Sequence, residues 1–105
     1  MIFIETPVFT EDVESLLSAE SYRALQEALQ LRPDAGSIIR GSHGLRKLRW
    51  GTPSSGKRGG VRVIYFWVGD EETIYLLSMY SKTRQDNLTP RQIRILIRLV
   101  QEEFS

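Results

Sequence analysis

The chain has 105 residues, of which 41% are hydrophobic and 26% charged, so its composition is that of a folded protein and excludes intrinsic disorder. Because it has no cysteine, disulfide frameworks, thiol nucleophiles and thiolate metal sites are also excluded. No apolar run approaches the roughly 20 residues that cross a bilayer, and the start lacks the features of a secretory signal. We therefore expect one cytoplasmic domain over residues 1–105, without a membrane partner.

The charges are distributed unevenly, although the net charge is only +1. Residues 1–35 carry seven acids and two bases, whereas residues 36–69 carry seven bases and no acid. Because local counter-charges are missing, the positive potential of this second block should attract a polyanion. The block therefore predicts a polyanionic partner or, alternatively, a solvated basic face.

The first third of the chain predicts a strand followed by two helices. The apolar stretch Ile2–Glu5 indicates a short strand. Phe9 and Val13 then begin a set of apolar residues at helical spacing. Ser18 is suited to cap a second helix, which should end before Pro33 because proline cannot continue a helix.

The middle of the chain predicts β-structure. Residues 37–41 indicate a brief extended piece, and residues 45–50 indicate a second strand. Residues 51–60, "GTPSSGKRGG", are rich in residues that break regular structure, and they predict a flexible loop. The segments 61–68 and 73–82 are dense in β-branched and aromatic residues and are separated only by "GDEE". They predict an antiparallel hairpin.

The last segment predicts a helix with a capping box. Thr89 is the expected N-cap, Pro90 the first helical residue and Gln92 the N3 partner. The expected core-facing stripe consists of Ile93, Leu96, Ile97 and Val100. Another face carries Arg91, Arg94 and Arg98, which predict a solvated edge or, alternatively, a secondary anion contact. This order of elements predicts an α+β fold, with two N-terminal helices and a C-terminal helix packed on one side of a small, mostly antiparallel sheet.

Two motifs that often carry chemistry do not fit this chain. Residues 51–58, "GTPSSGKR", nearly match a phosphate-binding P-loop, but Arg58 stands where a hydroxyl should hold magnesium, and a strand follows instead of a helix. His43 is the only histidine, so one chain cannot form a two-histidine ribonuclease site. Carboxylates do not gather around the basic block, so we predict neither a metal nor another cofactor.

Arg62, Tyr80 and Lys82 are the residues most suited to hold a phosphate together. Tyr80 and Lys82 are two residues apart at a strand end, so both side chains leave the same face, and Arg62 begins the partner strand at the same end. The competing interpretation is an aromatic at the core edge beside solvated cations. A regular four-residue connection would place Arg62 opposite Met79, so a shared site predicts either an irregularity such as a β-bulge or an Arg62 near enough to the strand end to swing round.

Four segments together resemble a known family. "GLRKLRW", "GKRGGVRVIYFW", "IYLLSMYSK" and "NLTPRQ", spread between Gly44 and Gln92, are similar to the HigB-like branch of the RelE superfamily, the toxins of type II toxin–antitoxin pairs. The resemblance implies a RelE-like fold and ribosome-dependent cleavage of mRNA. Members of the family cut mRNA on the ribosome and leave a 2′,3′-cyclic phosphate. The implied partners are the ribosome with its rRNA, mRNA, and a HigA-like helix-turn-helix antitoxin, through which alone operator DNA is contacted.

The resemblance also implies roles for individual residues. Arg62 corresponds to the transition-state arginine, and Tyr80 and Lys82 to the strand-end catalytic pair. The implied RNA-binding residues are Arg46, Lys47, Arg49, Lys57, Arg58 and Arg84. Because the 2′-hydroxyl of the substrate attacks the adjacent phosphorus, the protein must supply alignment and charge stabilisation. Lys82, or Tyr80 with a pKa lowered by cations, is the expected general base.

Other functions fit the same residues. A ParE-like gyrase inhibitor shares the fold but lacks this catalytic set. A non-catalytic nucleic-acid-binding module would use the basic block only for salt-dependent affinity. A degenerate toxin would act mainly as a co-repressor with its antitoxin.

Overall fold

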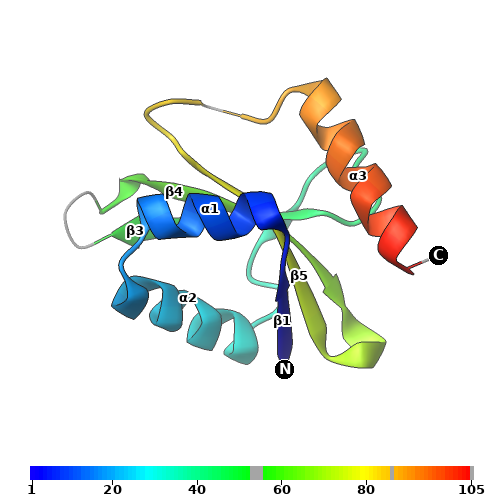
Figure 1. Cartoon of the computed structure of the whole chain (residues 1–105), viewed down its shortest axis with the longest axis horizontal. Coiled ribbons are helices and arrows are strands. Elements are labelled where there is room, and N and C mark those ends of the chain that lie inside the picture. The colour runs from blue at the N-terminus through cyan, green and yellow to red at the C-terminus, as the bar shows by residue number, and fades with distance from the viewer. Residues whose placement is uncertain (53–55, 86, 105) are drawn as a thin grey trace.

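The computed structural model describes residues 1–52, 56–85 and 87–104, the side chains of residues 52, 56–59 and 104 excepted. Its elements are β1 (Ile2–Glu5), α1 (Pro7–Leu16), α2 (Ala19–Leu31), β2 (Ser37–Ile38), β3 (Arg46–Thr52), β4 (Gly56–Val68), the 3₁₀ turn η1 (Gly69–Glu71), β5 (Thr73–Ser81) and α3 (Pro90–Phe104). The strands form one sheet in the order β1-β5-β4-β3-β2, with β1 parallel to β5 and the other pairs antiparallel (Figure 1). The predicted α+β fold with a mostly antiparallel sheet is confirmed.

The first two helices begin at side chains that cap them. Thr6 Oγ1 accepts a hydrogen bond from the N–H of Phe9, and Ser18 Oγ accepts one from the N–H of Ser21, each at 3.0 Å. Such caps satisfy amides that have no partner within the helix. Both helices cover one face of the sheet, where the buried core consists of Phe9, Val13, Leu17, Leu25, Leu29, Val61, Val63, Tyr65, Ile74, Leu76 and Met79.

The third helix covers the opposite face, so the expectation that all helices pack on one side is wrong. Leu96 and Val100 of α3 pack with Ile64 and Leu77 in a second buried cluster. The central strands are apolar on both faces, and each face requires its own cover to exclude water. The capping box is confirmed, since Gln92 and Thr89 exchange hydrogen bonds at 2.8 and 3.1 Å. No helix in the described ranges is long and apolar enough to cross a membrane.

The predicted loop over residues 51–60 is wrong for the described part of this segment. β3 continues through Thr52 and β4 begins at Gly56, and these two residues are paired across the ladder. Pairing with a neighbouring strand therefore overrides the low β-propensity of the glycines. Residues 53–55 lie outside the described residues.

The β4–β5 hairpin contains the predicted irregularity. The register shifts between Ile64 and Tyr65, and Leu77 is the extra residue that this shift leaves on β5. Beyond the bulge, Arg62 lies directly opposite Tyr80. Since residues directly opposite each other point to the same face, the bulge brings both side chains to the face that α3 covers.

Candidate phosphate-binding site

Arg49, Arg62 and Tyr80 form a row across three neighbouring strands. Arg49 of β3 lies opposite Arg62 of β4, which lies opposite Tyr80 of β5. All three side chains therefore leave the same face of the sheet. Like charges directly opposite each other destabilise a strand pair, and a bound anion would relieve that repulsion.

Arg62 and Tyr80 are buried, with 3% and 9% of their surfaces exposed. Within the described part of the chain, Arg62 Nη1 and the Tyr80 hydroxyl are buried without a hydrogen-bond partner. Proteins pair nearly all such atoms, because an unpaired buried polar group costs about 1–3 kcal/mol. Two adjacent donors of this kind match the acceptor oxygens of a phosphate.

The pKa of Tyr80 is raised, which corrects the expectation that cations lower it. Burial of the phenol is the main cause, and the nearby Arg62 charge opposes it only in part. Desolvation disfavours the phenolate, so the hydroxyl keeps its proton at neutral pH. Tyr80 is therefore suited to donate a hydrogen bond or a proton and not to act as a general base.

A hollow of about 230 Å³ lies over Tyr80, and we call it the basic hollow. It is lined by Ile39, Arg40, Lys47, Tyr80, Asn87, Leu88 and Ile93. Lys47 is on the same face as Arg49, and its Nζ donates to Asn87 Oδ1 at 3.0 Å. Arg40 was not among the predicted site residues, although its place in the acid-free block of residues 36–69 could have indicated it. Asn87 lies 40 residues away from Lys47 along the chain, and nothing in the sequence indicated their contact.

Lys82 and Arg84 follow Tyr80 in the turn after β5. The N–H of Lys82 donates to the carbonyl of Gly60 at 3.3 Å, which continues the hairpin by one residue pair, and its side chain is half-buried. Arg84 is exposed and lines a second hollow of about 180 Å³ together with Tyr80 and Asp12. Lys82 and Arg84 thus lie at the predicted end of the hairpin, and Arg84 and Tyr80 border the same hollow.

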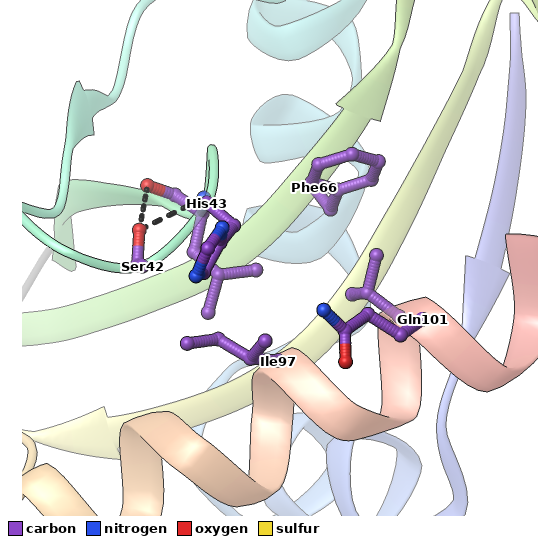
Figure 2. A pocket seen from close by; sticks show the side chains of 7 residues that line it. Ser42, His43, Phe66, Ile97 and Gln101 are labelled. Atoms are coloured by element: carbon purple, nitrogen blue, oxygen red, sulfur yellow. Dashed lines mark hydrogen bonds between the residues drawn. The ribbon is translucent and has the colours of Figure 1, made fainter. Parts of the chain in front are cut away.

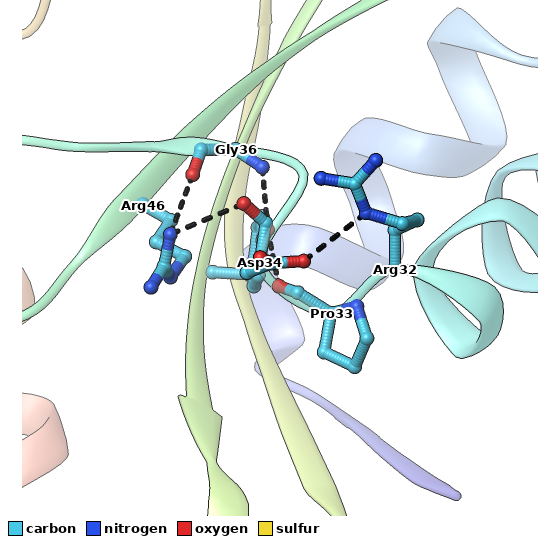
Figure 3. Close-up of polar contacts among 6 residues, drawn as sticks. Arg32, Pro33, Asp34, Gly36 and Arg46 are labelled. Carbon is cyan, nitrogen blue, oxygen red and sulfur yellow. Dashed lines mark hydrogen bonds and ion pairs between the residues drawn. The ribbon is translucent and has the colours of Figure 1, made fainter.

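Arg46 is not brought together with the other predicted RNA-binding residues. It pairs with Tyr65, whose side chain belongs to the core beneath α1 and α2. Arg46 Nη1 donates to the carbonyl oxygens of Asp34 and Gly36 at 3.2 and 2.8 Å, as Figure 3 shows. Its guanidinium also lies 6.0 Å from the centre of the Trp67 ring. These contacts fix the turn after α2.

The last two predicted RNA-binding residues are described only by their place in a strand. Lys57 and Arg58 lie at the start of β4, but their side chains are outside the described residues. Among the described residues, no three histidine or acidic side chains gather as metal ligands. The structure therefore offers no described donor set for a metal beside Arg62.

His43 lines a separate, apolar pocket of about 270 Å³ on the other flank of α3. Figure 2 shows it beside Ile97 and Gln101 of α3, with Phe66 across the pocket. Its φ angle is +61°, and the adjacent Ser42 Oγ accepts a hydrogen bond from the N–H of Leu45 at 3.0 Å. His43 lies in the turn between β2 and β3.

Comparison with known proteins supports the fold. No family model matches the chain. The isolated E. coli RelE toxin has a TM-score of 0.59 at 13% identity, covering 93% of this chain and 97% of that chain. A free E. coli RelE variant with two substituted arginines has a TM-score of 0.56 at 14% identity, covering 81% and 86%. A chain of the intact E. coli RelBE toxin–antitoxin complex has a TM-score of 0.56 at 17% identity, covering 74% and 92%. The chain therefore has the fold of the RelE toxin.

Proposed function

We propose that the chain is the toxin of a type II toxin–antitoxin pair and an endoribonuclease that cuts mRNA on the ribosome without a metal. The likeness to E. coli RelE, one copy of which comes from a toxin–antitoxin complex, supports the toxin role. The observation that carries the catalytic role is the adjacent pair of donors, Arg62 Nη1 and the Tyr80 hydroxyl, which are buried without a partner among the residues that the structure describes. Such a pair is costly for the fold and useful only when an anion binds.

In the proposed reaction, the 2′-oxygen of the substrate forms a bond to phosphorus while the bond from phosphorus to the 5′-oxygen breaks. The proton of the 2′-hydroxyl passes to a general base, for which Lys82 is the candidate. Arg62 stabilises the charge that grows on the phosphoryl oxygens. Tyr80, kept protonated by burial, donates to the phosphate or protonates the departing 5′-oxygen.

The proposed RNA-binding surface surrounds this pair. Arg40, Lys47 and Arg49 leave or border the same face, and the exposed Arg84 lies at the second hollow. Lys57 and Arg58 remain in the proposal on the strength of the sequence resemblance alone. Arg46 is left out, because its side chain is engaged on the opposite face. In this structure the side chains of Arg62 and Tyr80 are buried. Some of the residues that line the basic hollow must therefore move aside when RNA binds.

Substitution of Arg62 tests the catalytic role. In Arg62→Ala, cleavage of ribosome-bound mRNA should fall about 100- to 1000-fold, as expected for loss of a single charge-stabilising donor. Growth arrest should be lost while antitoxin binding and the circular dichroism spectrum are retained. Arg98→Ala is the matched control, because Arg98 is an exposed arginine on α3. Undiminished cleavage by a folded Arg62→Ala variant would reject the role.

Assays in cells and on the purified chain separate the alternatives. Primer extension on mRNA after induction should reveal cuts, whereas a nucleic-acid-binding module or co-repressor leaves none. A ParE-like inhibitor would instead block the supercoiling activity of gyrase. Cleavage of free RNA at the rate of ribosome-bound mRNA would contradict the proposed ribosome dependence.

A further inference from the structure

The β-bulge in β5 leaves two successive carbonyl groups on the same side of the strand. In a regular strand, successive carbonyls point to opposite sides. The carbonyls of Leu76 and Leu77, however, both accept hydrogen bonds from Thr6, the residue that follows β1. The Thr6 N–H donates to Leu76 at 3.1 Å, and the Thr6 hydroxyl donates to Leu77 at 2.8 Å. Because Leu77 is the extra residue of the bulge, Thr6 satisfies the carbonyl that the bulge leaves without a place in the ladder.

Helix α1 takes the place of a strand along the end of β5. The pairing of β1 with β5 ends at Glu5 and Leu76, and among the described residues no strand pairs with this edge of β5 beyond that point. Asp12 of α1 instead accepts a hydrogen bond from the N–H of Met79 at 3.4 Å. Side chains at the start and in the middle of α1 therefore contact the backbone of β5 at the bulge and beyond it.

The Thr6 hydroxyl is buried and makes two hydrogen bonds. Only 4% of the Thr6 surface is exposed, and Oγ1 also accepts from the N–H of Phe9 at 3.0 Å. A hydroxyl has a single donor, and here it is committed to Leu77. Without it, the Leu77 carbonyl would be buried and unpaired, which nearly all proteins avoid. The bulged register would then become less favourable relative to the regular one, in which Arg62 lies opposite Met79.

We propose that Thr6 is a positioning residue for the reaction, because its hydroxyl stabilises the bulge that places Tyr80 opposite Arg62. This role rests on the function proposed above. Thr6 acts on the site through the backbone of β5, and Asp12 assists it by fixing Met79, the residue before Tyr80. Loss of the bulge moves a catalytic side chain away from its partner, so it impairs the chemical step more than the binding of RNA.

Substitution of Thr6 separates positioning from RNA binding. Thr6→Val keeps the shape of the side chain and removes the hydroxyl. Its kcat for ribosome-bound mRNA should fall about 100-fold, as expected when a catalytic group is displaced by about 1 Å. Its KM should stay the same, because Lys47 and Arg49 lie on β3, whose register with β4 does not depend on the bulge. Thr6→Ser retains the hydroxyl and should therefore restore kcat.

Nuclear magnetic resonance reports the register without any measurement of activity. Because the Met79 N–H faces Asp12 and thus points away from β4, Val63 and Met79 form a pair without hydrogen bonds between them, with Cα atoms about 4.5 Å apart. The wild-type chain should therefore show a nuclear Overhauser effect between the α-protons of Val63 and Met79. Thr6→Val should lose this signal, and Thr6→Ser should retain it.

Two further variants serve as the control and as a second test. Ser18 caps α2 as Thr6 caps α1, so Ser18→Ala should lower stability without changing kcat or the Val63–Met79 signal. Asp12→Ala provides the test if Thr6→Val does not fold, since Asp12 is only half-buried. This variant should lower kcat and speed hydrogen exchange at the Met79 amide.

Several results would overturn the inference. A folded Thr6→Val variant that keeps both kcat and the Val63–Met79 signal would leave Thr6 as a helix cap alone. A fall in kcat with the signal retained, or an equal fall in Ser18→Ala, would show that the bulge is not the cause. If Thr6→Val does not fold, unchanged kcat in Asp12→Ala would contradict the role of α1. Absence of cleavage by the wild-type chain would refute the proposed function, whereas the Val63–Met79 signal would still decide whether Thr6 stabilises the bulge.

Discussion

Replacement of Tyr80 by phenylalanine should stabilise the protein and impair its proposed activity at the same time. The ring of Tyr80 packs in the core beneath α3, whereas its hydroxyl is buried without a partner in the described part of the chain. Tyr80→Phe therefore retains the packing and removes only the unpaired hydroxyl. Most substitutions in a core have the opposite effect on stability.

The expected gain follows from the cost of burying a hydroxyl that makes no hydrogen bond. This cost is about 1–3 kcal/mol, and 1 kcal/mol raises the Tm of a domain of this size by roughly 4 °C. The matched control is Tyr65→Phe, because the Tyr65 hydroxyl donates to Pro33 at 2.7 Å and accepts from Gly36 at 2.9 Å. The control should lose about 1–3 kcal/mol, since it leaves both backbone groups unpaired.

Urea denaturation and cleavage of ribosome-bound mRNA measure the two effects separately. Tyr80→Phe should reduce the cleavage rate about 100-fold if its hydroxyl donates to the phosphate. Because burial raises the pKa of Tyr80, the ratio of the wild-type and variant rates should stay constant from roughly pH 6 to 9. A less stable variant with full activity would refute the reasoning. A ratio that rises with pH would show that Tyr80 acts as a base.

Three further predictions concern other parts of the molecule. Arg49→Ala should weaken RNA binding and lower its salt slope by about 1, whereas Arg46→Ala should cost stability and leave RNA affinity unchanged, as measured by salt titration. Burial is the larger cause that raises the pKa of the Tyr22 phenol above its ordinary value of 10.0, and the hydrogen bond that the phenol donates to Glu5 is the second cause. The folded state therefore holds this proton more tightly, so stability should fall as pH rises above about 10, and Tyr22→Phe should show a shallower fall in urea melts. Gln92→Ala should cost about 1 kcal/mol and speed hydrogen exchange before α3, because it removes the bond to the Thr89 N–H.

Each of these predictions has a distinct contrary result. Equal losses of RNA affinity in Arg46→Ala and Arg49→Ala would contradict their separation onto opposite faces. An alkaline decline of the same steepness in Tyr22→Phe would mean that other tyrosines cause it. Unchanged stability in Gln92→Ala would show that the capping box contributes little to α3.

Local features of the structure followed from the sequence. The strand at Ile2–Glu5 and the caps at Ser18 and Thr89 lie where the sequence predicts them. Caps and hairpins depend on residues a few positions apart, so a short segment contains the necessary information. An irregularity between Arg62 and Tyr80 could also be predicted, as one of two ways to form a shared site, because it follows from counting residues through the hairpin.

Other features depended on contacts between distant segments. The sequence did not show that Leu77 is the bulged residue, since the choice depends on how both faces of β5 pack. Strand alternation places Arg46 and Arg49 on opposite faces, but the sequence did not show which of them faces α3, because that choice depends on the register of β3 with β4. The low β-propensity at Gly56 likewise did not reveal that β4 begins there.

The sequence by itself determined the order of the elements, the acid-free cationic block and the identity of the three residues proposed for catalysis. Only the tertiary structure decided that Arg62 Nη1 and the Tyr80 hydroxyl are buried without a partner among the described residues, and that Lys47 meets Asn87 at the hollow over Tyr80. The physical reason is the separation along the chain of the residues on which each property depends. Charge, caps and periodicity are properties of neighbouring residues, whereas burial and unpaired donors arise only when β3, β5 and the segment before α3 pack together.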